Sequence, residues 1–193
     1  MAVATQSEVT AKLVLAGAAG SGRGELLRAL ARRLNEVPVH EGQVGPARVL
    51  RIEAIWPEPL ADGRVLRLRV FAGTGPSSHN ATEELLVRGA DGVVLLFDVT
   101  PEQLRASWDA MVRLADNLRR AGTDIGRIPL AVQYHRADRH PGFSAERFDE
   151  WLGLPAGRWP RFVTAAECPD CEGGAIDAVV AGIGSRLAPV VSG

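Results

Sequence analysis

The sequence predicts a single α/β domain in which a mostly parallel, six-stranded sheet contains one antiparallel hairpin and carries helices on both faces. Three observations lead to this fold class. Short apolar stretches alternate along the chain with stretches whose leucines recur at helical spacing. Residues 92–99 (GVVLLFDV) are almost continuously apolar, as buried strands of a parallel sheet are. A length of 193 residues suits one domain with a proper hydrophobic core.

The first half of the chain predicts three strands and one helix. Residues 12–16 (KLVLA) form a short apolar strand that ends at the glycine-rich stretch 17–24, and the leucines of residues 25–34 recur at helical spacing. Residues 49–56 and 65–71 read as strands, and the second alternates apolar residues with Arg67 and Arg69. The turn-rich stretch 57–63 (PEPLADG) between these strands predicts the antiparallel hairpin.

The second half continues the alternation of helices and strands. Thr100, Pro101 and Gln103 have the spacing of a helix start, and we expect the long helix that follows to run to about Arg120. Its apolar stripe is predicted to pack in the core, whereas its arginines at 113, 119 and 120 are predicted to be solvated. The stripe consists of Leu104, Trp108, Met111, Leu114 and Leu118. The other predicted helices are 82–89, 145–152 and 175–187, and the other strands are 92–99, 128–134 and 161–164.

Composition narrows the function classes. The 22 basic residues against 23 acidic residues leave a net charge of −1, which argues against a dedicated nucleic-acid surface. No apolar run is long enough for a bilayer span, and the N-terminus has no secretory-signal pattern. Two cysteines fit a reducing compartment. We therefore expect a cytoplasmic protein without a transmembrane segment, one domain over residues 1–193 with loose tails at 1–10 and 189–193.

The glycine-rich stretch is the best candidate for a ligand site. It follows a strand and opens a helix, the context in which a loop of this kind cradles phosphate with backbone N–H groups. Gly17 and Gly22 occupy the two glycine positions of the pattern G-x-x-x-x-G-K-[ST], and Gly20 and Ser21 lie between them. Arg23 stands in place of the lysine, and Gly24 in place of the hydroxyl that ligates Mg²⁺. This loop predicts a phosphate site, or else a plain turn, and Gly24 argues against Mg²⁺.

From about Lys12 to Leu187 the chain resembles the bacterial MglA-type small Ras-like GTPases, which govern cell polarity and gliding motility. The resemblance rests on the glycine-rich loop and on three further stretches in the same order. These are Val70-Phe71-Ala72-Gly73-Thr74, similar to that family's T-V-P-G-Q; Pro129–Asp138 (PLAVQYHRAD), similar to Q-Y-N-K-R-D; and Thr164-Ala165-Ala166. It implies a Ras-like P-loop fold and, as a possible cofactor, GTP or GDP.

The resemblance also assigns a base-reading site. Asp138 stands where the family's aspartate recognises guanine, and His135 stands in place of the preceding asparagine. Ala165 and Ala166 are placed like the loop whose backbone amide contacts the base. The open alternative is that Asp138 is a solvated carboxylate and that the domain binds no cofactor.

Several departures from the family pattern remove hydrolytic groups. Thr74 replaces the glutamine that orients the attacking water, and it is too short for that role. Together with the changes at Arg23, Gly24 and His135, this predicts negligible GTP hydrolysis and no catalytic residue, because each such group contributes strongly to transition-state stabilisation. Val70 stands where Ras-like proteins have a metal-side aspartate, which MglA proteins already lack.

A separate hypothesis concerns zinc. Cys168 and Cys171 form a C-x-x-C pair close to the predicted base loop, which carries His135 and His140. Four such ligands could hold one Zn²⁺. The alternative is two free thiols in a turn.

Two functions follow from these observations. The first is a non-hydrolysing interaction or regulatory protein in bacterial polarity or motility, with protein partners such as the roadblock-type dimers of the family and with recruitment to a cell pole. The second is a guanine-nucleotide switch that binds GTP or GDP with weak or no hydrolysis.

Overall fold

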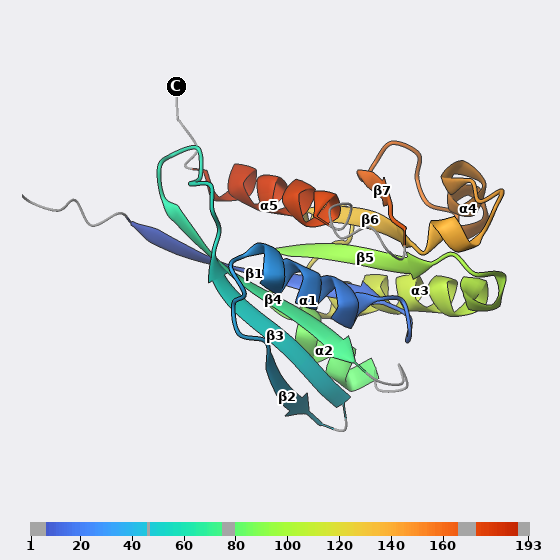
Figure 1. The fold of residues 1–193 in the computed structure, drawn as a ribbon, viewed down its shortest axis with the longest axis horizontal. Coiled ribbons are helices and arrows are strands. Elements are labelled where there is room, and N and C mark those ends of the chain that lie inside the picture. Colours follow the sequence, from blue (N-terminus) through green and yellow to red (C-terminus); the bar gives the residue numbers. More distant parts are fainter. Residues whose placement is uncertain (1–6, 46, 75–79, 166–172, 189–193) are drawn as a thin grey trace, which may run out of the picture.

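A seven-stranded sheet forms the centre of the molecule, in the order β2-β3-β4-β1-β5-β6-β7 (Figure 1). The computed structural model describes residues 7–45, 47–74, 80–165 and 173–188. The strands are β1 (Glu8–Gly17), β2 (His40–Val44), β3 (Ala47–Ile55), β4 (Val65–Thr74), β5 (Gly92–Asp98), β6 (Leu130–His135) and β7 (Arg161–Val163). The helices are α1 (Arg23–Arg33), α2 (Asn80–Val87), α3 (Leu104–Arg120), α4 (Ala145–Leu152) and α5 (Gly174–Leu187), with short 3₁₀ turns η1 (Pro101–Gln103) and η2 (Ala137–Arg139).

The sheet confirms the predicted fold class and corrects its strand count. Strands β4, β1, β5, β6 and β7 run parallel, and the predicted antiparallel hairpin is β3–β4. The prediction of six strands was wrong, because β2 adds a second antiparallel pair at the edge of the sheet. Its sequence, HEGQV, is exposed almost throughout and contains a glycine. It therefore has no apolar alternation, and pairing with β3 decides its conformation.

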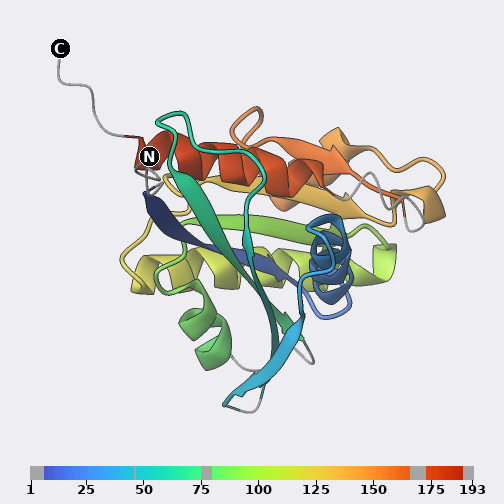
Figure 2. The same ribbon diagram turned by 60° about the vertical axis from the view of Figure 1, so that its left-hand side comes forward.

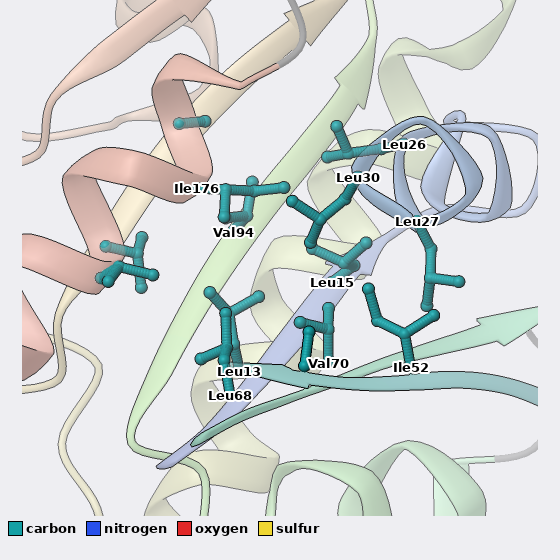
Figure 3. Close-up of a cluster of buried hydrophobic side chains, with 14 of the residues drawn as sticks. Leu13, Leu15, Leu26, Leu27, Leu30, Ile52, Leu68, Val70, Val94 and Ile176 are labelled. Carbon is teal, nitrogen blue, oxygen red and sulfur yellow. The ribbon is translucent and has the colours of Figure 1, made fainter. Parts of the chain in front are cut away.

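Helices cover both faces of the sheet, and each face has its own apolar core (Figures 1 and 2). Helices α1 and α5 pack on one face, where leucines of α1 and Ile176 of α5 meet Leu13, Leu68 and Val94 of the strands (Figure 3). Helices α2, α3 and α4 pack on the other face around Phe97 and Tyr134. Central strands are thus apolar on both sides, which explains their continuous apolar runs.

The alternation predicted for β4 is confirmed. Leu66, Leu68 and Val70 are buried under α1, whereas Arg67 and Arg69 lie on the opposite face. There Arg67 pairs with Glu8 of β1 and with Glu53 of β3, and Arg69 pairs with the same Glu53. These ion pairs link three neighbouring strands across the sheet.

Helix α3 differs from its prediction in three respects. Leu114 and Leu118 are buried as expected, but Trp108 is 37% exposed, where the Arg105 guanidinium stacks over its ring. Arg113 is not fully solvated, because it forms a half-buried ion pair with Glu83 of α2. The buried face also includes Ser107 and Asn117, two polar residues that the apolar stripe did not indicate.

Part of the tail predicted at residues 1–10 is not loose, because residues 8–10 belong to β1. Strand β1 begins at Glu8 and pairs with Val65 there, while residues 1–6 and 189–193 lie outside the described part of the chain. Within the described residues, no helix has the length and hydropathy of a membrane span.

Candidate phosphate and base loops

The loop between β1 and α1 has a conformation that requires glycine at two positions. Gly17 has φ +149°, and a Cβ there would lie 2.4 Å from the carbonyl oxygen of Leu96. Gly22 has φ +93°, and its Cβ would lie 2.7 Å from Cδ2 of His135. Both the backbone angle and the close neighbour therefore exclude a side chain. The conformation of the turn therefore requires glycine at both motif positions.

This loop and the start of α1 surround a hollow of about 250 Å³. Its lining includes Gly20, Ser21 and Gly22, together with Gly73 and Thr74 from the end of β4. The Ser21 hydroxyl is buried and has no hydrogen-bond partner, although a buried hydroxyl normally has one. Three arginines, Arg23, Arg28 and Arg136, also line the hollow. The donors and positive charge around it fit a phosphate group.

Arg23 lies deep beneath the loop. Its side chain is only 8% exposed, and it also lines a second cavity of about 30 Å³ between β1, α2 and α3. Burial lowers the pKa of the Arg23 guanidinium, and the Glu83 carboxylate opposes that shift. Asn117 lines the same inner cavity, with both amide atoms unpartnered. Arg23 is therefore shared between the phosphate hollow and a buried polar cluster, an arrangement that the sequence did not indicate.

The residues at the metal-binding positions do not fit Mg²⁺. Gly24 offers no side-chain oxygen, and Val70 is a fully buried hydrocarbon. Hard cations such as Mg²⁺ require oxygen ligands. Thr74 donates its hydroxyl to the carbonyl oxygen of Arg48 at 3.3 Å. The chain thus supplies no metal ligand at positions 24 and 70, and Thr74 is engaged with the neighbouring strand.

His135 ends β6 and is 3% exposed. Its Nε2 atom lies 3.2 Å from a carboxylate oxygen of Glu25, and its Nδ1 atom lies 3.4 Å from the hydroxyl of Thr164. The Thr164 hydroxyl also donates to the carbonyl oxygen of Tyr134 at 3.3 Å. His135 therefore connects the phosphate loop's helix with the segment that follows β7.

Arg136 follows His135 and adopts a left-handed conformation, with φ +61°. Its guanidinium donates to the Asp98 carboxylate at 2.9 Å, to Glu25 at 3.2 Å and to the carbonyl oxygen of Gly20 at 3.3 Å. Asp98 also accepts the backbone N–H of Thr100 at 3.0 Å, so it stabilises the turn that follows β5. The base loop and the phosphate loop are thus joined by side chains of this chain.

The remaining predicted site residues are only partly described. Asp138 lies in η2, two residues after Arg136, and Ala165 follows β7. Backbone hydrogen bonds from Thr164 to Tyr134 and from Ala137 to Thr164 bring the two segments together, as a base-reading site requires. Ala166 lies outside the described residues.

The zinc hypothesis remains a prediction. Cys168 and Cys171 lie outside the described residues, and His135 already contacts Glu25 and Thr164. His140 follows η2, and its backbone N–H bonds to the carbonyl oxygen of Ala137. Among the residues that the structure describes, no group of three or more His, Cys, Asp or Glu is placed to hold a metal ion.

Sequence reasoning missed two residues of this site, Glu25 and Arg136. An acidic residue in the first turn of a helix is usually read as favourable to the helix dipole, and Glu25 occupies that position. Arg136 stands where the family's Q-Y-N-K-R-D stretch has its lysine. Both positions could be noted in the sequence, but only the fold shows that the side chains of Glu25 and Arg136 meet.

Comparison with known proteins gives one informative similarity. No family model matches the chain. Over 84 residues it is 30% identical to the mutual gliding-motility protein MglA of Myxococcus xanthus (strain DK1622). The matched part is 42% of this chain and 43% of that relative, so it spans less than half of either. The similarity supports a relationship to small Ras-like GTPases, with which the α/β fold and its sheet are consistent.

Proposed function

We propose that this chain is a degenerate MglA-like domain that acts as a non-hydrolysing interaction or regulatory protein in bacterial polarity or motility. The observation that carries the proposal is the chemistry of the hollow. Gly24 and Val70 provide no metal ligand, and the Thr74 hydroxyl is bonded to the carbonyl oxygen of Arg48. Phosphoryl transfer depends almost wholly on positioning and on charge neutralisation by the metal.

The burial of Arg23 supports the same proposal. A lysine of the P-loop acts as a compact charge at the transferred phosphate, whereas a guanidinium is larger and planar. Here the guanidinium is largely buried, and its charge interacts with Glu83 of α2. A guanidinium held in this way is less available to stabilise a transition state than a lysine that reaches the transferred phosphate.

The partners that we propose are proteins. The net charge of −1 gives no basis for nucleic-acid binding. The similarity to a gliding-motility protein favours a role in that process, with a roadblock-type dimer as the partner that the family resemblance implies. We propose a cytoplasmic domain that is recruited to a cell pole by such a partner.

Single-turnover hydrolysis of GTP by the purified protein tests the proposal, with Mg²⁺ present and Arg23→Ala as the matched variant. We expect neither protein to release phosphate faster than buffer. Phosphate release above the buffer rate that disappears in Arg23→Ala contradicts the proposal, because it would show that Arg23 takes part in the reaction. Nucleotide and zinc released by denaturing the purified protein are measured in parallel.

The alternative function is a guanine-nucleotide switch with weak or no hydrolysis. Two observations favour it, namely the buried, unpartnered hydroxyl of Ser21, a residue that lines the hollow, and the position of Asp138 beside the segment of Ala165. The switch predicts near-stoichiometric GDP or GTP in the purified protein and a large loss of affinity in Asp138→Asn. Unchanged affinity in that variant excludes guanine reading at this position.

A further inference from the structure

A carboxylate bridge crosses the space between the phosphate hollow and the base loop. Glu25 projects from the first turn of α1 and contacts both His135 and Arg136, at 3.2 Å each. Arg136 is fixed in turn by the Asp98 carboxylate and the carbonyl oxygen of Gly20. We call the contacts of Glu25 with His135 and Arg136 the Glu25 bridge.

The bridge joins the edge of the hollow to the base loop. A nucleoside phosphate bound as in the related fold would place its phosphates in the hollow and its base at Asp138. Glu25 lines the hollow, and its partner Arg136 is two residues from Asp138. The first turn of α1 and the base loop are therefore joined where the ligand would pass between them.

The charge of Glu25 weakens the binding of any phosphate ligand, with or without a nucleoside. A carboxylate in the first turn of a helix interacts favourably with the partial positive charge that would otherwise attract phosphate. It also neutralises part of the positive charge of Arg136, and it repels an incoming polyphosphate. The arginines at 23 and 28 still line the hollow. A compact oxyanion needs only the hollow, whereas a nucleoside phosphate that reaches Asp138 would have to pass the Glu25 bridge.

We infer that Glu25 is a specificity-determining residue, which closes this site to nucleosides and leaves it open only to compact oxyanions of the phosphate class. This inference rests on the proposed non-hydrolysing function and names the ligand class of the same hollow. Glu25 acts both by occupying space and by its charge.

Binding of pyrophosphate and of GDP, each measured by calorimetry without Mg²⁺, tests the inference. The proteins are the wild type, Glu25→Ala and Glu25→Gln. Glu146→Ala is the matched control, since Glu146 is likewise an exposed acid in the first turn of a helix, α4. In the wild type and the control, we expect GDP to bind no more tightly than pyrophosphate. In Glu25→Ala, the ratio of GDP affinity to pyrophosphate affinity should rise at least about tenfold.

The variant Glu25→Gln separates the effect of the Glu25 charge from the effect of its side-chain size. It also keeps the inference testable if Glu25→Ala does not fold. Glu25→Gln keeps the size of the side chain, so it should bind both anions more tightly than the wild type with a smaller change in their ratio. Wild-type protein that prefers GDP tenfold or more overturns the inference, as does an unchanged ratio in Glu25→Ala. Absence of GDP binding in every variant overturns it too, because Glu25 would then not be what excludes the nucleoside. None of these readings depends on hydrolysis, so they are distinct from a failure of the proposed function.

Discussion

The Nε2 atom of His135 lies 3.2 Å from a carboxylate oxygen of Glu25, although 110 positions separate the two residues in the chain. The contact joins the first turn of α1 to the end of β6. The backbone of Gly22 passes so close to the imidazole that only a glycine fits there. The phosphate loop and the base loop are therefore one packed unit, held by side chains of the protein.

Replacing Arg136 tests the energetic importance of this unit. Arg136→Met leaves the Asp98 carboxylate, whose side chain is 6% exposed, without its cationic partner. We expect the free energy of unfolding to fall by about 1–3 kcal/mol, because a buried charge without a partner is costly. Urea unfolding followed by circular dichroism measures the change. In the control Arg105→Met, which breaks an exposed ion pair with Asp109, we expect little effect. Equal losses in both variants would contradict this account.

Glycine replacements distinguish backbone strain from side-chain crowding in the loop. Gly20→Ala imposes only the cost of a positive φ, since a Cβ there meets no atom within 4 Å, and we expect a loss of about 1–2 kcal/mol. Gly22→Ala adds the collision with His135 and should cost clearly more, about 3 kcal/mol or above. Thermal and urea unfolding of both variants provide the comparison. An equal cost would show that His135 moves aside freely.

The single tyrosine of the chain predicts a specific alkaline behaviour. Burial, followed by the hydrogen bond to Asp149, raises the pKa of the Tyr134 phenol above its ordinary value of 10.0. The unfolded chain therefore loses this proton more readily than the folded protein. The stability contributed by the protonated phenol is fully present below about pH 10 and is lost as the pH rises above it.

Phenolate absorbance measures this behaviour directly. Below the alkaline unfolding transition we expect the folded protein to show no phenolate, whereas protein in urea titrates near pH 10. The variant Tyr134→Phe keeps the ion pair of Asp149 with Arg161 and should show a weaker decline of stability above about pH 10. Titration of the folded protein near pH 10 would contradict the burial of the phenol.

Arg23 offers a test of its inward position. Arg23→Met removes a buried charge but leaves Glu83 paired with Arg113 at 3.1 Å. We expect the free energy of unfolding to stay the same or to rise by up to about 2 kcal/mol, because replacing a buried charge with an apolar side chain of similar size is often neutral or stabilising. Urea unfolding without added anions is the measurement. A large loss of stability would mean that Arg23 holds the loop together.

Much of the fold was predictable because the residue pattern within a single strand or helix indicates that element. The alternation of Leu66, Leu68 and Val70 with Arg67 and Arg69 defined the strand and its buried face, and residues 92–99 indicated a central strand. The glycine spacing placed the phosphate loop, and the family resemblance placed the base loop after β6. Strand β2 was missed because five exposed residues with a glycine carry no such pattern.

Tertiary structure alone decided which side chains meet in the site. The sequence indicated that Glu25 lies near the start of a helix and that Arg136 follows a strand, since both facts depend on neighbours in the chain. It could not determine that the two side chains meet at 3.2 Å, or that Arg23 is buried beside the cavity that Asn117 lines. Secondary structure reflects periodicity over a few residues, whereas such contacts depend on how helices and strands far apart in the chain pack together. The family pattern thus indicated a candidate site, and packing determined which charges line it.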